Sequence, residues 1–178
     1  MTTPATDTSS IETTRWRIDP ARSSIEFHVK MLWGMATVRG RFDQYEGTFD
    51  LSADPAIALT IDAASLDTKN EKRDAHLRSP DFFGVEEHPY LRYVSEAATL
   101  EGERLVARGR LHARGVTLPL SIEATLRSAG DELEIESATV VDYHQLGMTW
   151  GKTWNKMGVL RTPGKLVVKG RLIPHLGA

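Results

Sequence analysis

The sequence lacks several features that would assign a function at once. Its 178 residues contain no cysteine, which excludes disulfide scaffolds, thiolate metal sites and cysteine nucleophiles. Lys and Arg number 22 against 24 Asp and Glu, so no net basic charge attracts nucleic acid or an anionic membrane surface. No run of residues is apolar and long enough to span a bilayer as a helix. We therefore expect no nucleic-acid partner and no stable membrane insertion.

The first residues also lack the basic start and apolar core of a secretory signal. We interpret residues 1–14 as a flexible tail and residues 15–178 as one domain, since a chain of this length forms a single β core. The expected location is cytoplasmic. A leader removed upstream would leave the same sequence and would make the protein periplasmic or secreted.

Alternation of apolar and polar residues is the dominant pattern that is present. Ile25, Phe27 and Val29 define one strand face, and the same period of two recurs along the chain. The segments with this pattern are 24–30, 38–42, 48–52, 57–63, 105–113, 116–126, 133–143 and 165–173. Residues 45–47 are predicted to turn the second segment back on itself as a hairpin, and Gly115 marks the clearest hairpin.

Eight such strands either stack as a sandwich or close as a barrel. Gly40, Gly109 and Gly170 lie on the apolar faces, and small residues there favour the strong bending that closure requires. We predict an antiparallel barrel, whose interior at this strand number is filled by side chains or holds one slender ligand.

One charged segment interrupts the alternation between Thr68 and Phe83. Thr68 followed by Glu71 predicts a capping box, and Pro80 limits the far end of a short helix. The helix is too polar for a broad apolar stripe, so it is either a solvated surface helix or a lid bonded to the barrel. Phe82 and Phe83 favour the lid, since adjacent aromatic side chains can anchor it.

Two further clusters are apolar although they fall outside the strands. One comprises Met31, Leu32, Trp33 and Met35, and the other extends from Leu146 to Leu160. Met and Trp side chains in such connections suit an apolar ligand. The alternatives are a simple cap of the barrel end or a homodimer surface.

Enzyme motifs are absent from the sequence. Six histidines are scattered, without His-Glu-x-x-His spacing, a nucleophile elbow or a phosphate loop. An acid–base pair drawn from Asp74, His76 and Tyr143 or His144 remains as an alternative. We expect no cofactor and no metal site. Arg104, Arg108, Arg110 and Arg114 are interpreted as an outward, solvated strand face.

Several motifs together resemble the YceI family of lipocalin-like proteins. They are Trp16 to Pro20, Val38 to Phe42, Ala64 to Thr68, Arg73 to Ser79 with Asp81 to Phe83, His88-Pro89, Gly109 to Leu111, and Gly115 to Pro119. The resemblance spans about Trp16 to Pro174. It implies an all-β fold, a single antiparallel eight-stranded lipocalin-like barrel with one short helix as a lid. It also implies a lumen that binds a long apolar chain, typically a polyprenyl or isoprenoid-quinone-like lipid, and no established catalytic set or metal.

The sequence departs from the family at two places. Arg22 stands where the family usually has His after the Asp-Pro pair, and the segment from Lys30 to Met35 replaces another His with apolar residues. Both changes affect polar head contacts expected from the family.

The leading hypothesis is therefore a carrier that holds one isoprenoid-like chain and performs no chemistry. The alternative is a small barrel enzyme, an isomerase or hydrolase acting on an amphiphilic metabolite. Polar head contacts are predicted at Arg73, Asp74, His76, Arg78 and His144. Apolar ligand contacts are predicted at Phe27, Val29, Met31, Trp33, Met35, Val38, Phe42, Phe49, Leu59, Ile61, Leu77, Phe82, Phe83, Met148, Trp150, Trp154 and Met157.

Overall fold

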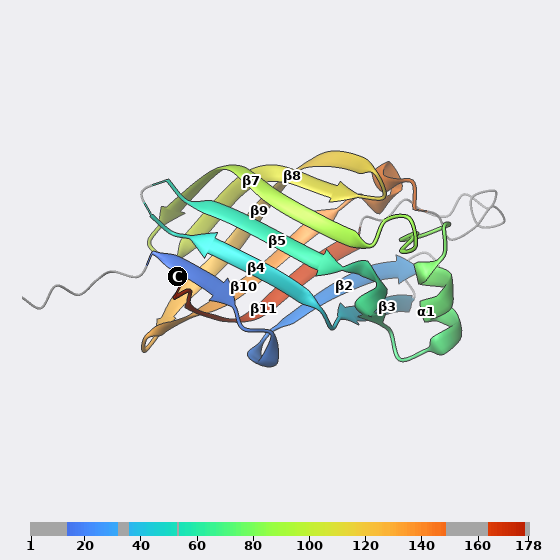
Figure 1. The fold of residues 1–178 in the computed structure, drawn as a ribbon, viewed down its shortest axis with the longest axis horizontal. Helices are drawn as coiled ribbons and strands as arrows, with labels where there is room; N and C mark the ends of the chain where they lie inside the picture. The colour runs from blue at the N-terminus through green and yellow to red at the C-terminus, as the bar shows by residue number, and fades with distance from the viewer. Residues whose placement is uncertain (1–13, 32–35, 53, 149–163, 177–178) are drawn as a thin grey trace, which may run out of the picture.

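The structure, a computed structural model, describes residues 14–31, 36–52, 54–148 and 164–176. The predicted tail therefore lies, apart from Thr14, outside the described residues. Within the described ranges eleven strands form one antiparallel sheet (Figure 1). They are β1 (Arg15–Ile18), β2 (Ser24–Met31), β3 (Ala36–Phe42), β4 (Tyr45–Asp50), β5 (Ala56–Asp62), β6 (Leu66–Asp67), β7 (Tyr90–Glu101), β8 (Arg104–Ala113), β9 (Val116–Ala129), β10 (Glu132–Val141) and β11 (Gly164–Pro174).

The helical elements are α1 (Glu71–Arg78) and the short 3-10 helices η1 (Pro20–Arg22), η3 (Ala63–Ser65) and η4 (Tyr143–Leu146). Figure 1 shows α1 at one end of the barrel and the C-terminus at the other. No helix in the described ranges is long and apolar enough to cross a membrane.

The sheet closes because β11 has two partners on one edge. Its first half pairs with β2, as in Leu166 opposite Phe27, and its last residues pair with β1, as in Pro174 opposite Trp16. Three pairs of consecutive strands, namely β1 with β2, β3 with β4, and β5 with β6, each form one long strand interrupted by a short irregularity. Counted in this way, the described strands form an eight-stranded barrel. The predicted eight-stranded antiparallel barrel with one helix is confirmed.

The hairpin predicted across residues 38–52 is wrong. β3 pairs with β2 and β6, whereas β4 pairs with β1 and β5, so the described chain bends at Asp43 and Gln44 without reversing. Gly47, taken for a turn residue, lies within β4 and is buried. A Cβ there would lie 3.2 Å from the side chain of Ile18 and 3.3 Å from that of Leu59. The glycine is explained by close packing.

Gly109 shows the bending predicted for the apolar face. It pairs with Ser95 beside a register shift in β7, and a Cβ on it would lie 2.2 Å from the carbonyl oxygen of Val94. Only glycine lets the two backbones approach this closely, and a bulge of this kind increases strand curvature.

The helix begins later than predicted. Asn70 is its N-cap, with its side-chain oxygen accepting from the backbone N–H of Arg73 at 3.0 Å. Thr68 instead donates its backbone N–H and its hydroxyl to Asp74, so the predicted capping box is wrong. Leu77 is fully buried and packs into the barrel core. The helix is thus held by one apolar side chain and by hydrogen bonds.

Candidate functional site

An apolar cavity of about 80 Å³ lies inside the end of the barrel at which α1 is found. It is bounded by strand ends, by the loop after α1 and by η4, and its lining is almost wholly carbon. The described lining residues are Phe27, Val29, Phe42, Ile61, Phe82, Phe83, Leu91, Leu111, Ala113, Val141, Tyr143, Leu146, Met148, Gly164, Lys165 and Leu166.

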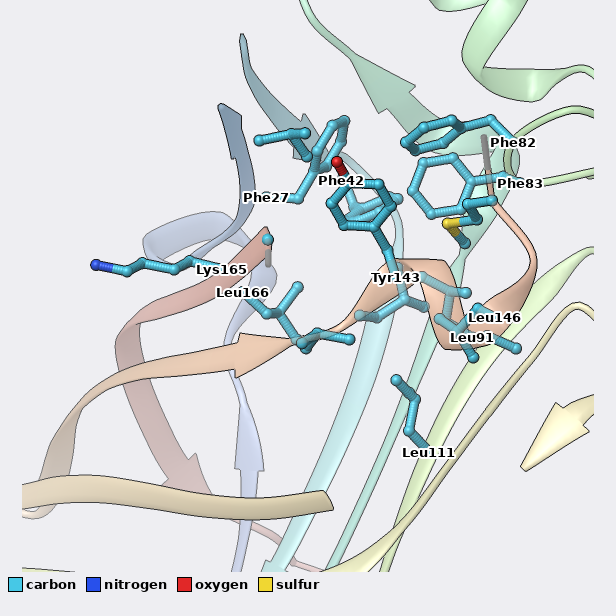
Figure 2. Close-up of a pocket in the computed structure, with 16 residues that line it drawn as sticks. Phe27, Phe42, Phe82, Phe83, Leu91, Leu111, Tyr143, Leu146, Lys165 and Leu166 are labelled. Carbon is cyan, nitrogen blue, oxygen red and sulfur yellow. The ribbon is translucent and has the colours of Figure 1, made fainter. Parts of the chain in front are cut away.

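Aromatic rings occupy much of this end of the lumen. The ring centroids of Phe27 and Phe42 lie 5.2 Å apart, and Phe83 lies edge-on to them at 5.7 and 5.8 Å. Phe82 is 5.3 Å from Phe83. Figure 2 shows the rings of Phe82 and Phe83 converging on those of Phe27 and Phe42, with Tyr143 directed toward the same cluster. These offset contacts are the favourable geometry for aromatic groups.

The loop after α1 positions two of these rings through its backbone. The N–H of Phe83 donates to the carbonyl of Leu77, and that of Phe82 donates to the carbonyl of Ser79. Both side chains are buried, Phe82 at 1% exposure and Phe83 at 6%. The predicted anchoring of the lid by Phe82 and Phe83 thus agrees with their placement.

The η4 turn brings a second group of side chains to the cavity. Asp142 caps it by accepting from the backbone N–H of His144 at 3.1 Å, and Gly147 ends it in the left-handed conformation with φ 73°. A left-handed residue is the usual way to end a helical turn. The turn places Tyr143, Leu146 and Met148 in the lining.

Arg114 joins the two segments that cover the cavity. It lies in the left-handed turn between β8 and β9, with φ 52°. Its guanidinium donates to the carbonyl of Pro80 at 2.8 Å, beside the lining residues Phe82 and Phe83, and also to the carbonyl of Gly147. Arg104 and Arg110 pair with Glu123 and Glu96 on the outer face, as expected. The interpretation of Arg114 as a solvated strand residue is wrong.

The polar side chains of α1 hold the helix in place. Asp74 is buried and bonds Thr68, and Arg73 donates to the hydroxyl and carbonyl of the same Thr68 at 2.8 Å. Arg78 donates to the carbonyls of Ala64 at 3.0 Å and Leu66 at 2.7 Å. These contacts fix α1 against η3, β6 and the adjoining Thr68. Arg73, Asp74 and Arg78 thus have structural contacts, and none of the head-group residues predicted on α1, His76 included, is among the described cavity lining.

The predicted apolar contacts separate into three groups. Seven line the cavity, namely Phe27, Val29, Phe42, Ile61, Phe82, Phe83 and Met148. Four are buried in the barrel away from its described lining, namely Val38, Phe49, Leu59 and Leu77. The remaining six, Met31, Trp33, Met35, Trp150, Trp154 and Met157, have side chains outside the described structure. The proposed dimer surface falls largely on the same undescribed residues.

Sequence reasoning missed four residues of the cavity wall that come from the ends of strands. Leu91, Leu111, Val141 and Leu166 line the cavity, and each occupies an inward position of a strand end. The signal was present in the alternation of these strands. It could have been used if the strand ends had been assigned to one end of the barrel, which requires the order of the strands.

Two nitrogen-bearing side chains in the described structure, those of Lys165 and His144, lie at the margin of the cavity. Lys165 belongs to the lining, and Figure 2 shows its amine directed away from the aromatic cluster. His144 stacks on Tyr143 with ring centroids 4.4 Å apart, and its buried Nε2 has no hydrogen-bond partner among the described residues. An unpaired buried polar atom is costly, which makes it a candidate ligand contact.

Of the alternative acid–base set, Tyr143 and His144 lie at the cavity, whereas the other two members do not line it in the described structure. Tyr143 lines it, but Asp74 and His76 are not among the described lining residues. No group of three or more His, Cys, Asp or Glu side chains in the described ranges is arranged to hold a metal ion.

Comparison with known proteins agrees with this architecture. Residues 16–169 match the family described as the YceI-like domain. The chain belongs to the YceI family. A relative, the UPF0312 protein plu2095 of Photorhabdus laumondii, is 36% identical over 112 residues, which cover 61% of this chain and 58% of that protein. The alignment thus spans little more than half of the relative.

Solved structures share the YceI fold. BcnA of Burkholderia cenocepacia superposes with a TM-score of 0.77 at 17% identity, over 86% of this chain and 98% of that one. A polyisoprenoid binding domain from Saccharophagus degradans superposes with a TM-score of 0.69 at 14% identity, over 92% of this chain and 99% of that one. Identities this low show that the fold is shared.

Proposed function

We propose that this YceI-family protein binds one long apolar lipid of the isoprenoid class in its barrel and carries out no chemistry on it. The observation that carries the proposal is the carbon-lined cavity at the α1 end of a closed barrel. The polyisoprenoid binding named for the Saccharophagus degradans domain supports the ligand class.

The cavity volume determines how a ligand would enter. At about 80 Å³ it is roughly half of the approximately 150 Å³ that holds benzene in an engineered protein cavity. A chain of several isoprene units therefore requires Phe27, Phe42, Phe82 or Phe83 to rotate away. Edge-on contacts between rings of about 0.5–1.5 kcal/mol are weak enough to be replaced by ligand contacts.

The energy available from the ligand exceeds this cost. Each methylene transferred from water into an apolar site gains about 0.8 kcal/mol, before the losses of ligand and side-chain freedom. Apolar contact thus supplies affinity, and polar groups supply orientation. Of the predicted head-group set, His144 is the member whose unpaired nitrogen is next to the cavity lining, so we place the polar end of the ligand near η4.

Organic extraction of the purified protein followed by mass spectrometry tests the proposal. The expected result is a near-stoichiometric isoprenoid lipid. Ala113→Leu adds bulk to the cavity lining and should reduce the recovered lipid severalfold. Ala138→Leu adds the same bulk on the exposed face of β10 and should not. Equal recovery from both variants, or no lipid in any sample, would contradict binding in the barrel.

A further inference from the structure

The inner face of β10 carries two buried hydroxyl groups, those of Ser137 and Thr139, which are 5% and 6% exposed. They alternate with the outward residues Glu136, Ala138 and Val140, so both side chains point into the barrel. Their inward neighbours along the strand, Ile135 and Val141, are apolar. The lumen therefore has a short polar strip in an otherwise apolar wall.

The two hydroxyl groups differ in their bonding. Ser137 donates to the carbonyl of Glu123 on β9 at 2.6 Å. In the part of the chain that the structure describes, no hydrogen bond is formed by the hydroxyl of Thr139. The hydroxyl of Thr139 therefore keeps both its donor and its acceptor available to a ligand in the lumen.

The strands separate at Thr139. Pairing of β9 with β10 stops at Ala124 opposite Ser137, whereas β8 stays paired with β9 as far as Val116, and β11 with β10 as far as Val141. On the N-terminal side of Ala124, the inward residues of β9 are only partly buried, although their partners on β8 are buried. These residues are Leu118, Leu120 and Ile122. The parting of the two strands thus leaves lumen surface exposed beside Thr139.

Thr139 is also next to the candidate binding cavity. It pairs with Leu166 of β11, which lines the cavity, and it precedes the lining residue Val141 by one inward position. His144, with its unpaired nitrogen, follows in η4 at the same end of β10. The free hydroxyl therefore lies where a ligand that fills the cavity would extend deeper into the barrel.

We propose that Thr139 is a specificity-determining residue, whose hydroxyl bonds an oxygen of the ligand inside the lumen. This deepens the proposed function and rests on it. The ligand class is then an oxygen-bearing isoprenoid, an alcohol or a carbonyl compound, in preference to a plain hydrocarbon. The Ser137 hydroxyl donates a hydrogen bond to the Glu123 carbonyl at the point where β9 and β10 stop pairing, and so stabilises the gap between these two strands.

The test compares two probes that differ by one oxygen. Farnesol and farnesene are dialysed to equilibrium against the protein and quantified by mass spectrometry. Thr139→Val replaces the hydroxyl by a methyl group of similar size and should weaken farnesol binding about fivefold, as expected for one hydrogen bond. Farnesene binding should stay within about twofold. Thr139→Ser retains the hydroxyl and should keep the preference for farnesol.

Two controls separate this role from a structural one. Thr99→Val makes the same change on the exposed face of β7 and should alter neither affinity. Thr139→Val should leave the melting temperature of the ligand-free protein unchanged or raised, because it removes an unpaired hydroxyl. A lower melting temperature, equal weakening of both probes, or no effect on farnesol would overturn the assignment. Failure of the wild-type protein to bind either probe would overturn the proposed function, and the assignment with it.

Discussion

The ring of Phe27 lies directly on the backbone of Gly40, its partner across β2 and β3. A Cβ built on Gly40 would lie 2.2 Å from Cζ of Phe27 and 2.4 Å from Cε1. Glycine at this position thus makes the space that the Phe27 ring occupies at the edge of the cavity. The aromatic cluster depends on the absence of one methyl group from the barrel wall.

Gly40→Ala should therefore lower the free energy of unfolding by about 1–3 kcal/mol, the usual cost of overpacking a core. Phe27→Leu removes the clashing ring atoms. In urea denaturation, the double variant should lose less stability than the sum of the two single variants, since the two side chains are in contact. Simple additivity would show that the ring moves aside freely.

Arg114→Gln should destabilise the protein by about 2 kcal/mol, because charge-assisted hydrogen bonds contribute about 1.5–3 kcal/mol. The carbonyls of Pro80 and Gly147 lose their shared donor. Arg114→Lys should recover only part of the loss, as a single ammonium lacks the fork of donors that reaches both carbonyls. Arg108→Gln on the exposed face of β8 is the matched control. Equal unfolding midpoints for the two Gln variants would contradict the bridging role.

Arg22 should make stability depend on pH in the acid range. Its guanidinium donates to Glu132 at 2.7 and 2.9 Å and to Asp19 at 2.7 Å. These bonds hold the pKa of the Glu132 carboxyl below its usual value of 4.5 and the pKa of the Asp19 carboxyl below its usual value of 3.8. A lowered folded-state pKa stabilises the folded state above the unfolded-state pKa, and this stabilisation is lost as pH falls through the folded-state value.

Arg22→Gln should thus be less stable than the wild-type protein at pH 7, by a small margin because the pairs are exposed. The difference between the two proteins should shrink below about pH 4.5. Thermal unfolding between pH 2 and 7 measures it, with Arg39→Gln as an exposed control. A difference that is constant over this range would rule out the carboxylates as the cause.

Tyr93 should affect stability at alkaline pH. Burial of its phenol, with a smaller contribution from Glu96, raises its pKa to about 12 from 10.0. Since the folded-state pKa is raised, stability is fully present below pH 10 and is lost as pH rises toward 12. Tyr93→Phe should lose less stability over this interval than the wild-type protein.

The same variant has a second expected effect at neutral pH. The hydroxyl of Tyr93 donates to the carbonyl of Leu120 at 3.3 Å, so its removal should cost about 0.5–1.5 kcal/mol. Tyr90→Phe, at an exposed position, is the control for both measurements. Parallel pH profiles for Tyr93→Phe and the wild-type protein would show that the Tyr93 phenol does not govern the alkaline loss.

Alternation of apolar and polar residues predicts the inward direction of Phe27, Val29 and Phe42, and these three predicted ligand contacts do line the cavity. Alternation continues to the last residue of β8 and does not show where the turn begins, so it predicts the wrong environment for Arg114. A glycine required by packing cannot be distinguished in sequence from one required by a turn, so the sequence predicts a turn at Gly47.

The polar residues of α1 show a similar limit. Asp74 and Arg73 are residue types that bind lipid head groups as readily as they bond backbone. Only their position relative to Thr68 decides between the two roles. The unpaired state of Thr139 could not be predicted either, because it depends on where β9 and β10 stop pairing.

The sequence by itself determined which side chains point inward, where the one charged helix interrupts the strands, and that the strands bend. These are properties of each segment's own backbone, since side chains alternate with a period of two whatever the strand pairs with. Tertiary structure decided which segments meet. Closure of β11 onto both β1 and β2, the bridge from Arg114 to Pro80 and Gly147, and the space beside Thr139 all join residues far apart in the chain. Such contacts depend on the order in which the strands pair around the closed barrel, which no single segment encodes.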